Sequence, residues 1–183
     1  MKLLVLVAVA AAAVAQPPPP AMSIGERVEL RSELLNEVRH LVVVKPFGYD
    51  ASRERYPVLY VLDGDQHYFH AAGILSFLAQ NGRIPPMLLV AVPSLQRNRD
   101  MTPPTEDENE KRFFPIRGGA DRFLEHLRDE LVPFVDRSYR TRPYRILVGH
   151  SLGGLFVIHA LTSEPRLFQG WIAISRASNG TGR

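Results

Sequence analysis

Runs of consecutive apolar residues limit the folds that this chain can adopt. Residues 57–62 and 87–92 are continuous apolar runs, and a shorter run of three apolar residues follows Arg145 in the segment 145–148. A strand with one solvated face would alternate apolar and polar residues, so these runs are typical of strands buried on both faces, as in a parallel sheet. A segment with helical spacing of its apolar residues follows each run, at 68–80, 121–135 and 152–162.

Three further segments complete a prediction of a doubly wound α/β sheet. Residues 28–34 and 39–45 have the composition of strands, and residues 171–175 form a last apolar strand after Gly170. Strands that alternate with helices favour right-handed crossovers and a mostly parallel sheet with helices on both faces. Residues 63–66 and 93–119 are expected to be loops, and a connection as long as the second is typical of a functional segment.

Two of the expected helices carry specific predictions. In residues 68–80, the expected apolar side consists of Phe69, Ala72, Gly73, Leu75, Phe77, Leu78 and Ala79. In residues 121–135, Asp121 is expected to cap the N-terminus, and Pro133 is expected to kink or end the helix.

The N-terminal residues resemble a secretory signal peptide followed by a tether. Lys2 precedes the apolar stretch 3–14, and Ala13-Val14-Ala15 is an A-x-A cleavage site. The stretch is shorter than the roughly 20 residues that span a bilayer, so no stable membrane anchor is expected after cleavage. We therefore expect a signal peptide at 1–15, a Pro-rich tether at 16–22, one domain at 23–175 and an irregular tail at 176–183.

Composition excludes several classes of function. The 183 residues contain no cysteine, which rules out disulfides, Cys-ligated metals and a thiol nucleophile. The 22 basic and 19 acidic residues are scattered along the chain, which does not indicate a nucleic-acid partner. Export of a chain without cysteine favours a bacterial periplasm or exterior.

Residues 149–153 have the pattern G-x-S-x-G between a predicted strand and a predicted helix. In a sharp strand-to-helix turn neighbouring backbones come close, so we expect Gly149 and Gly153 to be required because they lack a Cβ. The helix would direct free N–H groups and its positive end toward Ser151, which stabilises a developing oxyanion. The alternative is a glycine-rich turn in which Ser151 only caps the helix, although the spacing does not match a pyrophosphate-binding loop.

Four motifs together resemble the esterase family of α/β-hydrolases that includes enterochelin esterases, esterase D and feruloyl esterases. They are PVLYVLDG at 57–64, RNRDMTP at 97–103, ELVPFVDRSY at 130–139 and GHSLGG at 149–154. The resemblance extends from about residue 28 to residue 175 and implies the α/β-hydrolase fold and cleavage of carboxylic esters. It does not specify the ester.

The resemblance also implies roles for individual residues. Ser151 would be the nucleophile, and the backbone N–H of Leu152 would be one oxyanion donor. The second donor would come from the segment after strand 57–62, where Gly64 and Asp65 are the candidates. No cofactor and no metal are implied.

Each charged residue near this implied site has two possible interpretations. Arg97 and Arg99 would lie beside the site, where they could meet an anionic or hydroxylated substrate, but surface ion pairs explain them equally well. Asp63 and Asp65 are better explained by turn chemistry, in which their side chains bind nearby backbone N–H groups, than by metal binding.

The histidine that should activate the serine does not follow it at a usable position. In this fold the order along the chain is Ser, then Asp or Glu, then His. His159 is the one histidine after Ser151, and it would lie about 12 Å along a helix from it, whereas a Ser–His hydrogen bond needs about 3 Å. His67 and His70 could approach the site as substitute bases. The family's acid and histidine lie on later strands, so we expect a C-terminally truncated domain.

These observations predict an exported serine hydrolase that cleaves a small-molecule ester without a cofactor, with the histidine and acid of its triad absent from this chain. Two alternatives stay open: an acyltransferase of the same fold, and an inactive fragment or non-catalytic remnant. The sequence does not indicate an oligomeric state.

Overall fold

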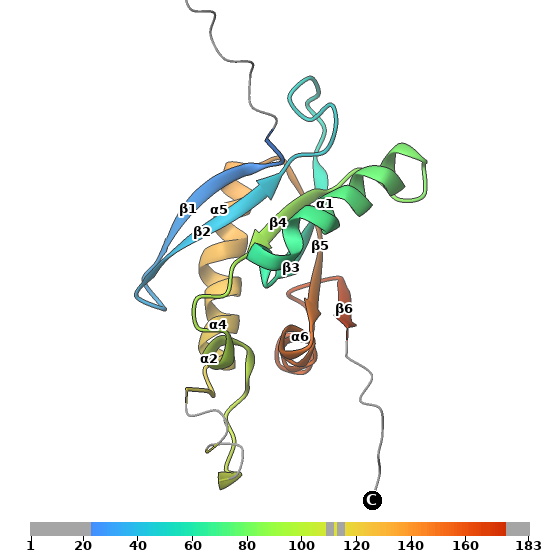
Figure 1. Ribbon diagram of the computed structural model, residues 1–183. Coiled ribbons are helices and arrows are strands. Elements are labelled where there is room, and N and C mark those ends of the chain that lie inside the picture. Colours follow the sequence, from blue (N-terminus) through green and yellow to red (C-terminus); the bar gives the residue numbers. More distant parts are fainter. Residues whose placement is uncertain (1–22, 109–111, 113–115, 175–183) are drawn as a thin grey trace, which may run out of the picture.

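The computed structural model describes residues 23–108, 112 and 116–174, and their strands form a six-stranded sheet (Figure 1). The strands are β1 (Glu26–Ser32), β2 (Glu37–Val44), β3 (Tyr56–Leu62), β4 (Leu88–Val92), β5 (Thr141–His150) and β6 (Gly170–Ile174). Their order across the sheet is β1-β2-β4-β3-β5-β6. β2 runs antiparallel to β1 and β4, and the other neighbours are parallel, which confirms the predicted mostly parallel sheet.

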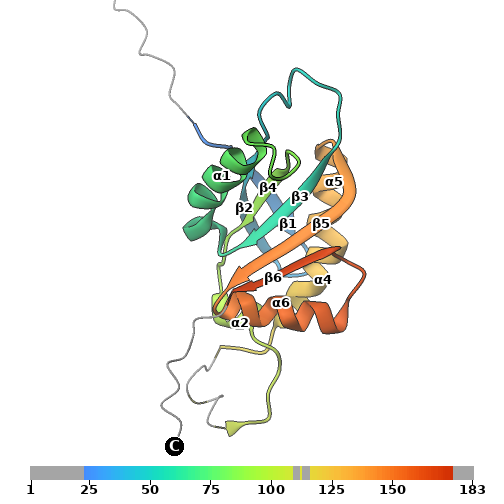
Figure 2. The same ribbon diagram turned by 90° about the vertical axis from the view of Figure 1, so that its right-hand side faces the viewer.

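Helices cover both faces of this sheet, as predicted. They are α1 (Gly64–Gln80), α2 (Arg97–Met101), α4 (Ala120–His126), the π-helical turn η1 (Leu127–Leu131), α5 (Val132–Ser138) and α6 (Leu152–Ser163). Figure 2 shows α1 on one side of the sheet and α4, α5 and α6 on the other. Accordingly, one apolar cluster joins the sheet to α1, and a larger one joins it to α4, α5 and α6.

The two continuous apolar runs form the central strands. Every residue of β3 and of β4 is buried, because these strands pair on both edges and have helices on both faces. The prediction that residues 57–62 and 87–92 form strands buried on both faces is therefore confirmed.

Among the described residues no helix is long and apolar enough to span a bilayer. The predicted segments 1–15, 16–22 and 176–183 lie outside the residues described.

Residues 63–66 are not the loop that the sequence predicted. α1 begins at Gly64, and the N–H groups of Gln66 and His67 already donate to the carbonyl of Asp63. The predicted apolar side is right at Ala72 and Leu75, which pack against the sheet, and wrong at Phe69 and Phe77, which are 63% and 67% exposed. The helix packs on the sheet through Ala72, whose small side chain lets the helix backbone approach the strands.

The helix expected at 121–135 begins earlier and ends later than predicted. Gly119 is its N-cap and Asp121 caps nothing, since the Asp121 carboxylate lies in the first turn, 2.9 Å from Nε2 of His159. Pro133 neither ends the helix nor leaves it regular. The N–H of Val132 donates to the carbonyl of Leu127, a π-type bond that widens the turn just before the proline. The helix continues to Ser138 because this wider turn accommodates a residue without an N–H.

A buried group of ion pairs anchors α2, a helix that the sequence did not predict. The Arg39 side chain is fully buried, and its Nη2 lies 2.7 Å from Asp100 and 2.8 Å from Glu37. Arg99 contacts both carboxylates from the other side, at 2.7 Å each. Burial alone would raise the pKa of Glu37, but the hydrogen bond from Arg99 and the two arginine charges lower it below its ordinary value. The charges compensate one another, so α2 is fixed to β2.

Replacing Asp100 by Asn should destabilise the fold, because it removes the negative charge that lies against a buried arginine. We expect the free energy of unfolding, measured with urea, to fall by about 3 kcal/mol. The control is Glu33→Gln, which breaks an exposed pair with Arg31 and should change stability by less than about 1 kcal/mol. Equal effects of the two substitutions would show that the buried pairs do not anchor α2.

His126 makes stability depend on pH. Its side chain is fully buried, and Nδ1 lies 2.6 Å from Oε2 of Glu130, whose other oxygen accepts the N–H groups of Glu33 and Leu34. Burial lowers the pKa of His126, although the hydrogen bond to Glu130 opposes this. The native state therefore holds His126 neutral at pH values where the unfolded chain is protonated.

We expect the free energy of unfolding to fall as the pH drops below about 6.5, with a contribution from His126 of at most about 1.4 kcal/mol per pH unit. The sign follows from linkage, since the unfolded state binds the proton first. His126→Gln should flatten this dependence between pH 6.5 and 5. His40→Gln, at an exposed position of β2, is the matched control and should keep the wild-type slope.

Candidate active site

Ser151 lies in a tight turn between the end of β5 and the start of α6. Its backbone has φ 59° and ψ −117°, a left-handed conformation that is strained for a residue with a side chain. The N–H of Ser151 donates to the carbonyl of Ile174 on β6 at 2.8 Å, and its own carbonyl accepts the N–H of Leu155 at 3.0 Å. The turn is thus held between β6 and α6, and the Ser151 residue is exposed.

The structure confirms the expected requirement for a glycine before the serine. A Cβ on Gly149 would lie 2.3 Å from the carbonyl oxygen of Gly153, so no side chain fits there. The expectation for Gly153 is wrong, because a Cβ on it would meet nothing closer than 3.4 Å. Its neighbour Gly154 is more crowded, at 3.0 Å from the carbonyl oxygen of Ile174, because β6 passes beside that residue.

Parallel pairing brings a second helix N-terminus to this turn. Val61 of β3 pairs with Val148 of β5, so the two strands end at the same edge of the sheet. α1 begins two residues after β3 ends and α6 begins two residues after β5 ends. The first N–H groups of a helix have no partner within it. The backbone N–H groups of Gly64, Asp65 and Leu152 therefore belong to unpaired helix starts at one edge.

Asp63 and Arg97 connect the two helix starts. Asp63 is buried and left-handed, with φ 50°, and its carboxylate accepts hydrogen bonds from Ser94 at 2.7 Å and from Nε and Nη2 of Arg97 at 2.8 and 3.0 Å. Arg97 Nη2 also donates to the carbonyl of His150 at 3.3 Å. Turn chemistry does not explain Asp63, because its carboxylate does not cap α1. The sequence hint was an aspartate directly after a buried strand, which does not reveal its partner.

The two arginines predicted beside the site are both in ion pairs. Arg97 is bound to Asp63, whereas Arg99 is bound to Glu37 and Asp100 and faces β2. About a third of each side chain is exposed, at 32% and 29%. A role for either arginine in binding substrate stays a prediction. Asp65, one of the two candidates for the second oxyanion donor, is exposed at the start of α1.

Three histidines gather next to the turn. The ring of His67 lies 5.1 Å from that of His70 and 5.9 Å from that of His150, the residue before Ser151. Burial, together with the neighbouring His70, lowers the pKa of His67. Within residues 23–108, 112 and 116–174, no side chain makes a hydrogen bond to Oγ of Ser151. His159 is not part of this group, as its position along α6 predicted, and its ring contacts Asp121 instead.

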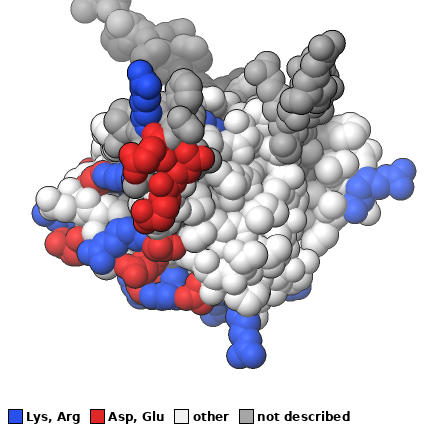
Figure 3. Space-filling view, turned by 90° about the horizontal axis from the view of Figure 1, so that it is seen from below, with Lys and Arg blue, Asp and Glu red and all other residues white. Residues whose placement is uncertain are grey.

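These histidines line an apolar trough of about 400 Å³ that includes Gly149 and His150. Its other walls are side chains of α1, β3, β5 and β6, such as Ile74, Val148 and Ile172. Figure 3 views the molecule from below, where α2 and α6 lie in Figure 1. Charged side chains gather on one part of that face, and a broad area carries neither sign. Apart from the three histidines, the residues that line the trough are apolar, so the trough suits an uncharged group.

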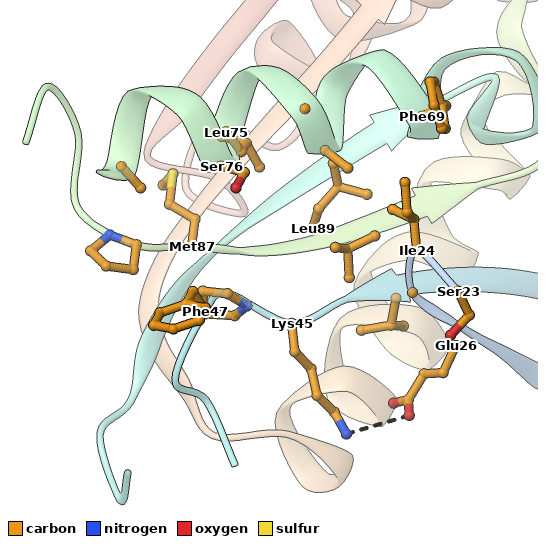
Figure 4. Close-up of a pocket in the computed structure, with 18 of the residues that line it drawn as sticks. Ser23, Ile24, Glu26, Lys45, Phe47, Phe69, Leu75, Ser76, Met87 and Leu89 are labelled. Carbon is orange, nitrogen blue, oxygen red and sulfur yellow. Dashed lines mark ion pairs between the residues drawn. The ribbon is translucent and has the colours of Figure 1, made fainter. Parts of the chain in front are cut away.

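Figure 4 shows a larger cavity, of about 780 Å³. It separates α1 from β2 and β4, with Phe47 and Met87 toward one end and Phe69 and Ile24 toward the other. None of its lining residues belongs to the turn 149–153. We therefore place the candidate site at the smaller trough.

Gly149→Ala should displace the serine turn, because its Cβ would overlap the backbone of Gly153. We expect a loss of about 2 kcal/mol in the free energy of unfolding. Gly153→Ala is the matched control, since its Cβ has room and alanine favours a helix, so stability should stay equal or rise. If both variants unfold alike in urea, the close approach at Gly149 is not what fixes the turn.

Comparison with known proteins identifies the family. The family model described as "Putative esterase" matches residues 32–180. Ferri-bacillibactin esterase BesA of Bacillus subtilis is 30% identical over 154 residues, which cover 75% of this chain and 53% of that protein. The siderophore triacetylfusarinine C esterase of Aspergillus fumigatus is 30% identical over 132 residues, which cover 65% of this chain and 43% of that protein.

A solved structure gives the same result. The IroE-like serine hydrolase from Shewanella oneidensis is 36% identical, with a TM-score of 0.71, over 79% of this chain and 48% of that one. The chain spans about half the length of the curated relatives that it matches. The family match covers most of the sequence, so this chain belongs to the esterase family of α/β-hydrolases.

Proposed function

We propose that this chain supplies the nucleophile and the oxyanion-binding groups of an exported serine hydrolase that cleaves carboxylic esters. The observation that carries the proposal is the exposed, strained Ser151 at the edge where α1 and α6 both begin. The proposal of export rests on the sequence pattern of residues 1–15 alone.

The proposed reaction uses the side chain of Ser151 and the two helix starts. Oγ of Ser151 attacks the ester carbonyl, and the carbonyl oxygen becomes an oxyanion. The N–H of Leu152 and the N–H of Gly64 or Asp65 donate to that oxyanion, and the positive ends of both helix dipoles stabilise it. One such donor typically lowers the barrier by about 3 kcal/mol. A general base takes the proton of Oγ during the attack and gives it to the alcohol as the alcohol leaves. The same base then takes a proton from water, which attacks the acyl group and releases it as a carboxylic acid, and the proton returns to Oγ.

A histidine outside these 183 residues serves as the general base in this proposal. His159 is engaged with Asp121, and none of the three clustered histidines bonds to Oγ of Ser151 in the part of the chain that is described. Without a base, the oxyanion site alone leaves about 10³- to 10⁴-fold catalysis over water. The same observation favours the second candidate, a non-catalytic remnant of the fold, for these residues on their own.

The substrate that we propose is a siderophore-type ester with an uncharged group next to its scissile bond. One of the relatives described above is named as a siderophore triacetylfusarinine C esterase and another as a ferri-bacillibactin esterase. The apolar trough beside His150 would accept the uncharged group.

Labelling with a fluorophosphonate tests the nucleophile. We expect the chain to form a covalent adduct slowly, since the proposed base lies outside it, and to lose this adduct in Ser151→Ala, because the oxyanion donors favour attack on phosphorus by that serine. Ser163→Ala, at an exposed position of the same helix, should label like the wild type. Equal labelling of wild type and Ser151→Ala would end the proposal. With an ester substrate, transfer to an added alcohol instead of water would assign the chain to acyltransferases.

A further inference from the structure

We propose that Arg97 is a positioning residue that holds the two oxyanion-binding helix starts in register. The inference rests on the proposed function for its catalytic consequence, but its structural part is independent. Arg97 joins the carboxylate of Asp63, at the start of α1, to the carbonyl of His150, just before Ser151.

The two residues next to these contacts are both strained. Asp63 and Ser151 have φ of 50° and 59°, a region that side-chain-bearing residues seldom occupy. Such conformations persist only where the surroundings fix them. Each turn has backbone hydrogen bonds of its own, from Gln66 and His67 to Asp63 and between Ser151 and its neighbours Ile174 and Leu155. Arg97 in addition binds to both turns at once. Its removal should therefore loosen both turns.

The burial of Asp63 makes its ion pair with Arg97 important for stability. The carboxylate is 1% exposed and accepts hydrogen bonds from Ser94 and Arg97. It accepts none from the backbone N–H groups at the start of α1. A buried carboxylate without a compensating cation is strongly unfavourable. If Arg97 is lost, Asp63 has to move toward water, and α1 begins at the next residue.

The shape of arginine matters as much as its charge. Nε and Nη2 of Arg97 bind the two different oxygens of Asp63, and Nη2 also reaches the carbonyl of His150. A planar guanidinium presents donors in this fixed arrangement, and a lysine ammonium does not. Lysine would keep the charge beside Asp63 and lose the connection to His150.

Arg97 is itself presented from a fixed support. It is the first residue of α2, and Asp100 of the same helix is bound to the buried Arg39. Met101, also on α2, is fully buried, and its sulfur lies 3.7 Å from the Cβ position of Gly153 in α6. α2 thus connects β2, the start of α1 and the start of α6.

Hydrogen exchange tests the structural part without any activity. The amides to follow are those of His67, Ser151 and Leu155, which donate to the carbonyls of Asp63, Ile174 and Ser151. In Arg97→Gln we expect these amides to exchange about tenfold faster, as local opening becomes easier. Arg128→Gln is the matched control, since Arg128 is similarly exposed and bridges Asp129 to Glu164 at the far end of α6. Unchanged exchange in Arg97→Gln would overturn the proposal.

Fluorophosphonate kinetics test the catalytic part. We expect the maximal rate of labelling to fall about 10- to 100-fold in Arg97→Gln and in Arg97→Lys, with an unchanged half-saturating concentration. A residue that bound the substrate would instead raise that concentration, and this result would overturn a positioning role. Arg97→Lys, which leaves no buried charge unpaired, keeps the test valid if Arg97→Gln folds poorly.

The double variant Asp63→Asn, Arg97→Met separates positioning from stability. It removes both charges together, so its melting temperature should recover toward that of the wild type, whereas its labelling rate should stay low. Recovery of the rate along with the stability would overturn the proposal. If wild type and Ser151→Ala label equally, the proposed function fails, and the exchange measurement still decides whether Arg97 holds the two turns.

Discussion

The parallel pairing of β3 with β5 is the constraint on which the rest of the site depends. Because Val61 lies beside Val148, both strands end at one edge, and each is followed within two residues by a helix. Two helix N-termini, with their unpaired N–H groups and the positive ends of their dipoles, are therefore brought to the same place. A serine at that edge lies in the electrostatic environment that stabilises a developing negative charge.

Buried ion pairs fix the geometry of this edge, but the fold is destabilised if one partner of a pair is lost. Arg39 and Asp100 fix α2 to β2, and Arg97 then reaches from α2 to Asp63 and to the carbonyl of His150. Each pair is buried or partly buried, so it stabilises the fold only while both partners are present. An apolar core could hold α2 equally well, but it could not donate hydrogen bonds to two strained turns at once. The arrangement suits a site that needs fixed geometry.

The sequence predicted well whatever depends on local pattern. The apolar runs identified β3 and β4, and the G-x-S-x-G pattern identified the turn at Ser151, because burial on both faces and close backbone approach impose local composition. The sequence did not predict features that depend on contacts with residues distant along the chain. Nothing local indicates that Arg39 is buried, that Asp63 binds Arg97, or that Phe69 and Phe77 face outward, because each depends on what packs opposite. For the same reason the sequence does not show that Gly154 is more crowded than Gly153, since the crowding comes from β6.

A crystal structure of the chain after reaction with a phosphonate ester tests the central claim most directly. The account predicts phosphorus bonded to Oγ of Ser151, with one phosphoryl oxygen about 3 Å from the N–H of Leu152 and from the N–H of Gly64 or Asp65. A phosphonate that is bound to another residue would contradict the account. So would an adduct on Ser151 whose oxygens point away from both helix starts.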